Sequence, residues 1–326
     1  MSRADVVGIV GAGTFGTSLA IALARAGREV VIYTKTASVA EAIRTTRRCP
    51  RLPGPELPAS VAVVTDARAL AAAARYVVFA VSSTDAPARL AELGGVIDGS
   101  HLVVHAIGAL VGDDERVSVL IERATPALRV GVVAGPARPR DLAGGEFGSM
   151  VVASRFDEVV RETRRLLNVP PVLRVYGSHD VVGVELASAL AGAYTVALGL
   201  ADGISIGPGP RAVLITRAVA EASRLGEASG GQSKTFAGLA GLGNVLVRSG
   251  EEGDPDYELG RALARGEAIG PERFSEGARA ALAGVRLARR KDVRMPLLAG
   301  LAAVLSGKMS IRDAARLAAD TVAAEE

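Results

Sequence analysis

The sequence is poor in cysteine and in aromatic residues. It contains one Cys, no Trp and 3% aromatic residues among its 326 residues. The single cysteine, Cys49, excludes an intramolecular disulfide, and the scarcity of aromatic rings leaves little for stacking on nucleic-acid bases. The chain has 38 Lys and Arg residues against 35 Asp and Glu residues, so its net charge is small and does not indicate a nucleic-acid partner.

Charged side chains are also nearly missing from one long segment. Between residues 181 and 200 the only ionisable side chains are Glu185 and Tyr194. About 20 predominantly apolar residues suffice to cross a bilayer. Glu185, Ser188 and the lack of Trp or basic residues at either end favour a buried core helix over a membrane span. Near the start, Asp5 and several glycines interrupt the apolar run that a signal peptide needs, so we expect a cytoplasmic protein.

The pattern of the chain changes near Ser178, and its length suits two domains. Before this point buried strands alternate with helices at 14–26, 67–75 and 156–167, the last with Ser154 as its N-cap. After it, Ala/Leu/Arg-rich helical segments are interrupted by Gly/Pro clusters at 207–210, 226–231 and 250–255. The expected strands are 6–10, 29–33, 61–64, 76–81, 101–106, 129–134, 150–153 and 172–176. We therefore predict an α/β domain over residues 1–178 and an all-α domain over 179–326.

A glycine-rich segment, GAGTFG at 11–16, follows the first expected strand and opens the first expected helix. This context makes GxGxxG a specific sign of dinucleotide binding. Gly11 permits the tight turn, Gly13 lets a pyrophosphate approach the backbone, and Gly16 allows close helix packing. Thr14 and Phe15 complete the loop, whose helix N-terminus offers free N–H groups. The sequence therefore predicts a site for NAD or NADP.

The end of the second strand bears on the choice between these two cofactors. A carboxylate there would bind the ribose 2′-hydroxyl of NAD, but this strand is followed by Thr34 and Lys35. A 2′-phosphate would meet no repulsion and would find a cation in Lys35. An exposed lysine without a role in binding is an equally good interpretation.

Several segments in order resemble the bacterial NAD(P)-dependent glycerol-3-phosphate dehydrogenases over nearly the whole chain. They are GAGTFGTSLA (11–20), RLPGPELP (51–58), AGPARP (134–139), VVGVELASALAG (181–192), ISIGPGPRAVLITRA (204–218), TFAGLAGLGN (235–244) and SEGARAA (275–281). The resemblance implies an α/β Rossmann domain followed by an all-α domain of the 6-phosphogluconate dehydrogenase type. It also implies a role in glycerophospholipid metabolism, a hydride transfer that converts glycerol 3-phosphate to dihydroxyacetone phosphate, and a cofactor contact from Glu276.

The same resemblance assigns the proton-transfer groups to positions where this sequence differs. The family has a Lys followed by Asn on its first α-domain helix, where this chain has Ala191 and Gly192. A second family Lys precedes Gly at a strand end and corresponds to Ile107. The Asp of the family's Gly-Leu-Gly-Asp segment corresponds to Asn244. Neither Ile nor Ala can carry a proton, so these positions cannot do the family's acid–base chemistry.

The positions implied for the substrate phosphate differ as well. A family Thr corresponds to Arg248, and the Ser-Arg-Asn phosphate clamp corresponds to the segment Asp254, Pro255 and Asp256. Gly135 and Ala137 stand in the segment that the family has as Gly-Pro-Ser. Because carboxylates repel a phosphate, we expect a weakly active or non-catalytic homologue that still binds the dinucleotide.

The alternative is an active dehydrogenase with a rearranged site, on glycerol 3-phosphate or another small molecule. His105 is a candidate replacement acid–base, although a packed or capping role suits it better, and Arg248 is a candidate anion holder. We expect Lys234 to be exposed, Arg138 and Arg140 to face the cofactor phosphates, the pocket or solvent, and residues 286–294 to form a solvated helix face. The ligands implied are the dinucleotide and a small phosphorylated or other small molecule, with no metal ion, and a homodimer is compatible with the sequence.

Overall fold

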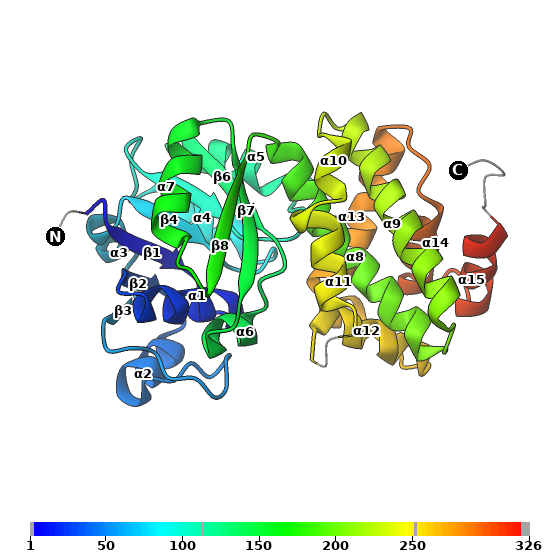
Figure 1. The fold of residues 1–326 in the computed structure, drawn as a ribbon, viewed down its shortest axis with the longest axis horizontal. Helices are drawn as coiled ribbons and strands as arrows, with labels where there is room; N and C mark the ends of the chain where they lie inside the picture. The colour runs from blue at the N-terminus through cyan, green and yellow to red at the C-terminus, as the bar shows by residue number, and fades with distance from the viewer. Residues whose placement is uncertain (1–2, 113, 251–252, 321–326) are drawn as a thin grey trace. The chain divides into compact units, whose positions relative to one another are not determined.

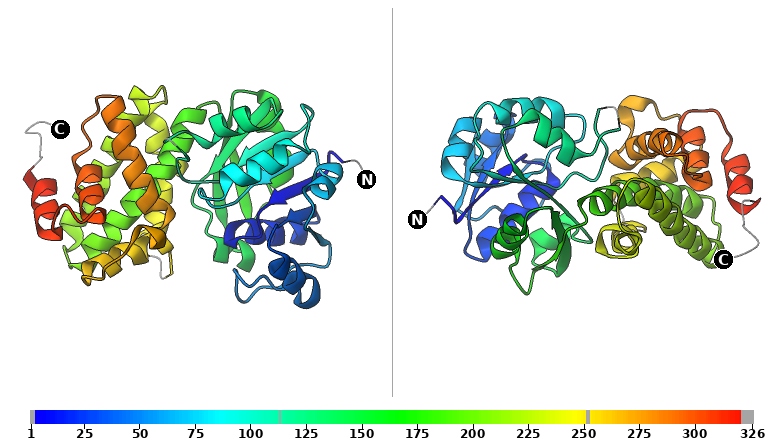
Figure 2. Two further views of the ribbon diagram at one scale, coloured as in Figure 1. Left: turned by 180° about the vertical axis from the view of Figure 1, so that it is seen from behind. Right: turned by 90° about the horizontal axis from the view of Figure 1, so that it is seen from above.

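The computed structural model describes residues 3–112, 114–250 and 253–320, which form two compact units (Figures 1 and 2). The first unit comprises the chain up to Ile107 together with Val117–Val181, and the second comprises Gly108–Arg116 together with the chain from Val182. The main division thus falls after Val181, where the sequence suggests Ser178. The short segment Gly108–Arg116 was not expected in the helical unit, and the side chain of Arg116 joins it there by donating to Glu185 Oε2 over 2.8 Å.

The first unit is built on one eight-stranded sheet in the order β3-β2-β1-β4-β5-β6-β7-β8. Neighbouring strands run parallel except β6 and β7, which are antiparallel. The strands are β1 Val6–Val10, β2 Glu29–Tyr33, β3 Val61–Val64, β4 Tyr76–Phe79, β5 Leu102–His105, β6 Arg129–Ala134, β7 Gly148–Ser154 and β8 Leu173–Ser178. Each expected strand is present, with β4 and β5 shorter and β7 longer than the sequence indicates.

Helices lie on both faces of this sheet (Figure 2). Both central strands β4 and β5 are buried at every position, as expected for a parallel sheet covered on both faces. The helices are α1 Thr14–Arg25, α2 Ala37–Thr46, α3 Ala67–Ala73, α4 Ala86–Gly94, α5 Val117–Ala124, α6 Pro139–Gly144 and α7 Asp157–Leu167. This arrangement is the predicted Rossmann-type α/β domain.

The prediction that Ser154 is the N-cap of α7 is wrong. The N-cap residue is Phe156, and no side chain caps this helix end. Ser154 lies at the end of β7, where its hydroxyl donates to Val130 O over 2.6 Å and accepts from Phe156 N over 3.1 Å. The hydroxyl is therefore used to join β7 to β6 and to turn the chain before the helix.

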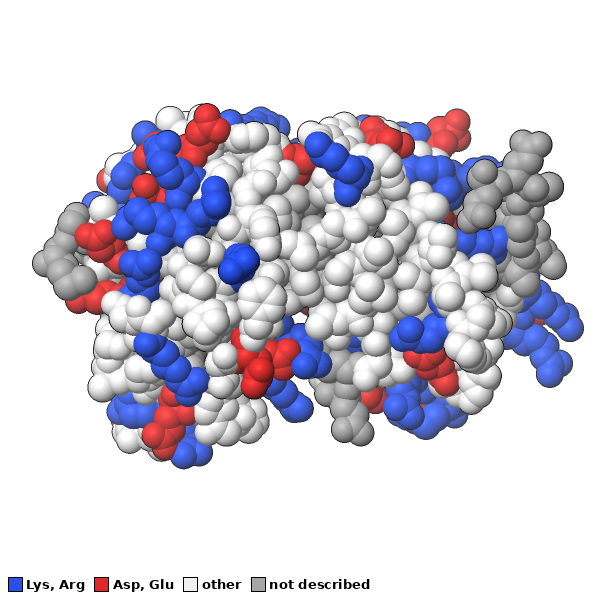
Figure 3. Space-filling model, viewed as in Figure 1, with Lys and Arg blue, Asp and Glu red and all other residues white. Residues whose placement is uncertain are grey.

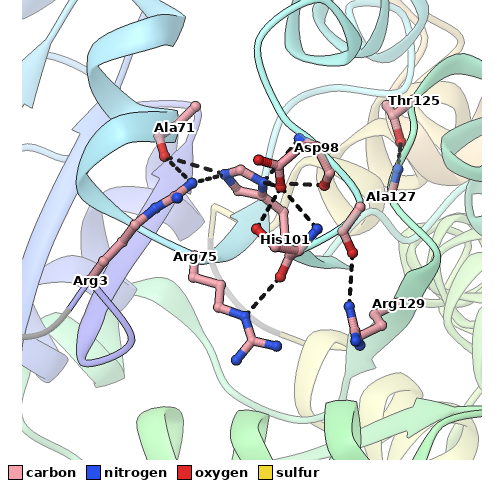
Figure 4. A network of polar contacts seen from close by, with 10 residues as sticks. Arg3, Ala71, Arg75, Asp98, His101, Thr125, Ala127 and Arg129 are labelled. Atoms are coloured by element: carbon pink, nitrogen blue, oxygen red, sulfur yellow. Dashed lines mark hydrogen bonds and ion pairs between the residues drawn. The ribbon is translucent and has the colours of Figure 1, made fainter.

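The buried His101 connects Arg3, before β1, with α3 and with the loop that precedes β5 (Figure 4). His101 is 1% exposed, and its Nε2 lies 2.5 Å from Arg3 Nη2. Because a guanidinium only donates, Nε2 accepts from Arg3 and Nδ1 donates to Asp98 Oδ1 over 2.9 Å. The side-chain and backbone hydrogen bonds from Ser100, followed by the bond from His101, lower the pKa of Asp98 to about 2. Arg3 also donates to Ala71 O over 2.6 Å, so this network joins the segment before β1 to α3.

The second unit is helical, and α8 (Val181–Gly203) is its long apolar helix. This helix is long and apolar enough to cross a membrane, but 89% of its most apolar stretch is buried inside the protein, which supports the core-helix interpretation. Its small residues allow close packing, since a Cβ on Gly199 would lie 2.1 Å from Tyr257 O. The other helices are α9 Pro208–Ala228, α10 Ser233–Phe236, η1 Leu239–Gly243, α11 Asn244–Arg248, α12 Pro255–Ala264, η2 Pro271–Arg273, α13 Glu276–Arg290, α14 Pro296–Leu305 and α15 Ile311–Asp320.

The basic side chains of residues 286–294 are exposed, as the sequence predicts, although α13 ends at Arg290 and two of these arginines also pair with a buried carboxylate. Arg286 Nε contacts both carboxylate oxygens of Asp114 at 3.0 Å, and Arg290 Nη1 contacts Asp114 Oδ2 at 2.8 Å. Asp114 is buried, so it requires these partners. Charge is locally compensated elsewhere too: on the face of the first unit drawn in Figure 3, basic and acidic side chains lie side by side. In the first unit, Arg165 pairs with Asp5 and Glu162.

Candidate functional site

The glycine-rich loop joins β1 to α1 at the carboxyl ends of β1 and β4, where the strand order reverses. Gly11 has φ +114°, and a Cβ there would lie 2.3 Å from Ala80 O, so only glycine fits. A Cβ on Gly16 would lie 2.2 Å from Gly11 O, whereas one on Gly13 would meet no heavy atom within 4 Å. No side chain caps the first turn of α1. The loop therefore combines an open glycine with available N–H groups, which fits a dinucleotide pyrophosphate.

The other residues of this loop are held by their neighbours. Thr14 Oγ1 donates to Arg51 O over 3.3 Å, and Phe15 packs partly buried against the core of the first unit. The thiol of Cys49 donates to Ala12 O over 3.5 Å. Segment 48–57 thus lies directly against the nucleotide loop, a contact that the sequence alone does not indicate.

At the end of β2, Thr34 is buried and the Lys35 side chain is 64% exposed. Lys35 Nζ lies 3.9 Å from Glu92 Oε2 of α4, and Tyr33 OH donates to Glu92 Oε1 over 2.6 Å. Burial and then Glu92 raise the pKa of Tyr33 to about 12. Arg89 contacts Glu92 as well. The end of β2, where the sequence predicts only the cation of Lys35, therefore also has a carboxylate nearby, that of Glu92 in α4.

The residues that the resemblance assigns to the site after β5 and β6 are apolar. Ile107 is 4% exposed and donates its N–H to His105 Nδ1 over 3.4 Å, and His105 is fully buried. Gly135 has φ +146°, and a Cβ there would lie 2.7 Å from Ser149 O. Ala137 is buried.

Two arginines flank this Gly-Pro segment. Arg138, the N-cap residue of α6, pairs with Asp141 Oδ1 over 2.8 Å. Arg140 is exposed, as is Lys234 at the start of α10, which confirms the expectation for Lys234.

In the helical unit, the residues implied for substrate binding come from α8, α11, α12 and α13. Ala191 is 2% exposed. A Cβ on Gly192 would lie 3.0 Å from Asp256 Oδ2, 3.2 Å from Arg248 Nη1 and 3.2 Å from Gly277 Cα. The space beside Gly192 is therefore filled by the side chains of Arg248 and Asp256.

Arg248 forms an ion-pair cluster with Asp254 and Asp256. Its Nε lies 2.9 Å from Asp254 Oδ2, and its Nη2 contacts Asp256 Oδ2. Asp256 Oδ1 accepts from Gly277 N over 2.7 Å, and Asp254 caps α12 by accepting from Asp256 N and Tyr257 N. Burial disfavours the charged guanidinium, but the two carboxylates outweigh burial and raise the pKa of Arg248. Arg248, the candidate anion holder, thus binds two carboxylates of its own chain, and the cluster holds two negative charges and one positive.

The remaining implied residues lie nearby in the chain. Asn244 is the first residue of α11 and is 9% exposed. Glu276 is the first residue of α13, and its Oε1 lies 3.0 Å from Arg279 Nη2. Ser275 caps this helix by accepting from Ala278 N.

Comparison with known proteins extends the resemblance to both units. Residues 6–160 match the model of the NAD-dependent glycerol-3-phosphate dehydrogenase N-terminus, and residues 180–316 match that of its C-terminus. A glycerol-3-phosphate dehydrogenase (NAD(P)+) from Bradyrhizobium sp. strain BTAi1 is 33% identical over 312 residues, which cover 95% of each chain. One from Streptomyces coelicolor is 34% identical over 314 residues, 94% of this chain and 93% of that one. The crystal structure of glycerol-3-phosphate dehydrogenase from Coxiella burnetii superposes with a TM-score of 0.91 at 23% identity, over 97% of this chain and 98% of the other.

The Rossmann-type sheet, the glycine-rich loop and the helical second unit define a two-domain protein of the NAD(P)-dependent dehydrogenase class. Within that class, the matches over both units show that the chain belongs to the NAD-dependent glycerol-3-phosphate dehydrogenase family. Its cofactor is accordingly a nicotinamide dinucleotide.

Proposed function

We propose that this family member binds NAD(P) but interconverts glycerol 3-phosphate and dihydroxyacetone phosphate weakly or not at all. The observation that carries the proposal is the Arg248–Asp254–Asp256 cluster, which occupies the positions assigned by resemblance to the substrate phosphate. A phosphate dianion that approached this cluster would meet an excess of negative charge. Its one guanidinium is already held by both carboxylates, so binding of the phosphate would require breaking those contacts.

The proton-transfer positions support the same conclusion. Ile107 and Ala191 are apolar and buried at positions where the family has lysines by resemblance. Without a positioned acid, the developing charge on the C2 oxygen of the substrate has neither a proton donor nor a cation. We expect the loss of the acid–base group alone to lower kcat by about 10² to 10⁴. The protein would then act in the cytoplasm as a cofactor-binding or cofactor-sensing homologue.

The experiment combines binding and turnover on the same preparation. NADH and NADPH are titrated by fluorescence, and dihydroxyacetone phosphate reduction is then followed at saturating cofactor. We expect micromolar cofactor binding, on the order of 8 kcal/mol, with turnover far below ordinary rates. Reduction at roughly 10 per second, a typical enzymatic rate, would contradict the proposal.

The alternative is a dehydrogenase that acts on a small substrate through rearranged groups. Arg248 favours it, because its Nη1 lies 3.2 Å from the position of a Cβ on Gly192, beside the helix that carries the family lysine. His105 is less suited to this role, since its ring is fully buried and accepts from Ile107 N. Comparing dihydroxyacetone with its phosphate distinguishes the two proposals, because only a rearranged site would reduce the uncharged ketone at an ordinary rate.

A further inference from the structure

Residues 48–57 form a compact loop, here called the 48–57 loop, that packs against the nucleotide loop. Its two ends meet in an antiparallel bridge between Arg48 and Glu56, whose side chains also pair over 2.6 Å. Its apolar side chains Leu52 and Leu57 are each 2% exposed and belong to the core cluster that includes Ala12. Prolines at 50, 53 and 55 restrict the backbone of this segment. The loop is therefore a preformed element.

Two polar contacts join this loop to the nucleotide loop. The Cys49 thiol donates to Ala12 O over 3.5 Å, between Gly11 and Gly13. Thr14 Oγ1, at the first residue of α1, donates to Arg51 O over 3.3 Å. Both contacts lie where the backbone must hold its shape for a pyrophosphate to bind. A displacement of the 48–57 loop would therefore remove support from the nucleotide loop itself.

One side chain anchors the base of the 48–57 loop. Arg47 Nε donates to Leu57 O over 3.3 Å, and its Nη2 donates to Val61 O over 3.1 Å and to Pro58 O. Its backbone O accepts from Leu57 N over 2.7 Å. Arg47 has φ +56°, a left-handed conformation that a non-glycine residue adopts only where its surroundings compensate. Here the compensation comes from the carbonyls that its guanidinium binds.

We propose that Arg47 is a positioning residue for the dinucleotide, which acts by holding the 48–57 loop against Ala12 and Thr14. Arg47 contributes preorganisation: it fixes the wall of the nucleotide loop before the cofactor arrives, so the cofactor does not have to order that wall on binding. Removal of the guanidinium should weaken binding of NADH and NADPH alike. The reason is that the proposed effect acts through the pyrophosphate loop and not through the adenine base or the ribose 2′-position.

Cys49 is the only cysteine in the chain and therefore reports on this contact directly. Its thiol is 2% exposed, so reaction with 5,5′-dithiobis(2-nitrobenzoic acid) should be slow and slower still with saturating NADH. In Arg47→Ala we expect the thiol to react about tenfold faster and the Kd for NADH to rise about tenfold, which corresponds to about 1.4 kcal/mol. Arg47→Lys, which can still donate to one carbonyl, should give intermediate values.

Arg44→Ala is the matched control. Arg44 lies in the last turn of α2, whose C-cap residue is Arg47, and its side chain donates to Val63 O over 3.1 Å, but it contacts no residue of the 48–57 loop among the described hydrogen bonds. Its Kd for NADH should stay within about twofold of the unmutated value. A folded Arg47→Ala with an unchanged Kd and an unchanged thiol reaction overturns the proposal, as does a lower Tm accompanied by an unchanged Kd.

If Arg47→Ala does not fold, Arg48→Ala and Arg47→Lys provide the test. Arg48 is exposed and its pair with Glu56 closes the 48–57 loop, so its loss should not endanger folding. We expect Arg48→Ala to raise the Kd about two- to threefold and to speed the thiol reaction. Unchanged Kd values and thiol rates in both variants overturn the proposal. The readouts are cofactor binding and thiol chemistry, so they do not depend on whether the protein turns over a substrate.

Discussion

A substitution at Gly13 should affect cofactor binding without affecting folding, unlike substitutions at the other glycines of the nucleotide loop. Its φ of −84° is accessible to every residue, and a Cβ there meets nothing within 4 Å, unlike those at Gly11 and Gly16. Gly13→Asp should therefore fold normally but lose detectable NADH binding, because its carboxylate would stand against the pyrophosphate. Fluorescence titration measures the loss.

Gly144→Asp is the control for this substitution. A Cβ on Gly144, in α6, also meets no heavy atom within 4 Å, and the neighbouring Ala143 O accepts from Arg25, at the opposite end of α1 from the nucleotide loop. It should bind NADH as the unmutated protein does. A Gly13→Asp variant that binds NADH within about threefold of normal would show that the pyrophosphate does not approach this loop.

A second prediction at the scale of residues concerns Lys35 and Glu92. The carboxylate of Glu92 lies 3.9 Å from Lys35 Nζ and would repel a 2′-phosphate that the lysine attracts. We expect Lys35→Ala to lower the ratio of NADPH to NADH affinity and Glu92→Gln to raise it. The measurement is the pair of Kd values for each variant at one ionic strength. If neither substitution changes the ratio, the end of β2 does not contact the 2′-position.

At the scale of elements, Glu221 joins α9 to the start of α14. It is 2% exposed and accepts from Leu297 N over 2.8 Å, from Leu298 N over 3.2 Å and from Tyr194 OH over 3.0 Å. Burial raises its pKa, although these hydrogen bonds and Arg224 oppose the shift. A carboxyl whose pKa is higher folded than unfolded stabilises the protein fully below its unfolded pKa of about 4.3, and that stabilisation is lost as pH rises through the folded value.

Glu221→Gln should therefore remove this pH dependence. At about pH 4 we expect it to lower the free energy of unfolding by roughly 1 to 3 kcal/mol, because its amide cannot accept from Leu298 N. The difference from the unmutated protein should shrink as pH rises, since only the glutamate has an ionised form to destabilise. Urea unfolding at several pH values measures it, and a difference that grows with pH would mean that the folded pKa is not raised.

At the scale of the whole molecule, the prediction concerns groups that act together. By resemblance the family reaction uses lysines at the positions of Ile107 and Ala191. Ala191→Lys alone should recover little activity, because a buried lysine without partners tends to lose its proton. The changes that approach the family pattern are Ile107→Lys, Ala191→Lys, Gly192→Asn, Asn244→Asp, Pro255→Arg and Asp256→Asn.

The structure adds Arg248→Thr to this set. A Cβ at position 192 would lie 3.0 Å from Asp256 Oδ2 and 3.2 Å from Arg248 Nη1, so we expect Gly192→Asn to be accommodated better when the arginine is shortened. We expect the seven changes together to reduce dihydroxyacetone phosphate faster than the sum of the single variants, since groups that act as a unit are strongly non-additive. The six changes without Arg248→Thr are the control and should stay less active. Equal rates for the two sets would show that Arg248 does not obstruct the site.

Short-range patterns allowed the sequence by itself to determine much of this protein. The alternation of strands and helices before Ser178, the glycines of GAGTFG and the apolar helix α8 depend on neighbouring residues, and the backbone preferences and burial of such segments repeat with a local period. The sequence also determines the chain order of the family motifs and the positions where Ile107, Ala191 and Gly192 depart from them.

Only the tertiary structure decided which distant groups meet. The sequence alone does not predict that Glu92 lies near Lys35 or that Arg248 and Asp256 lie against Gly192. It also does not predict that Gly108–Arg116 belongs to the helical unit. No periodic pattern in the sequence marks these contacts, because they depend on how whole helices and strands pack and on which charges become buried. The physical reason is the same in each case: local geometry follows from the backbone of a few residues, whereas the environment of a charge is set by side chains that arrive from elsewhere in the chain.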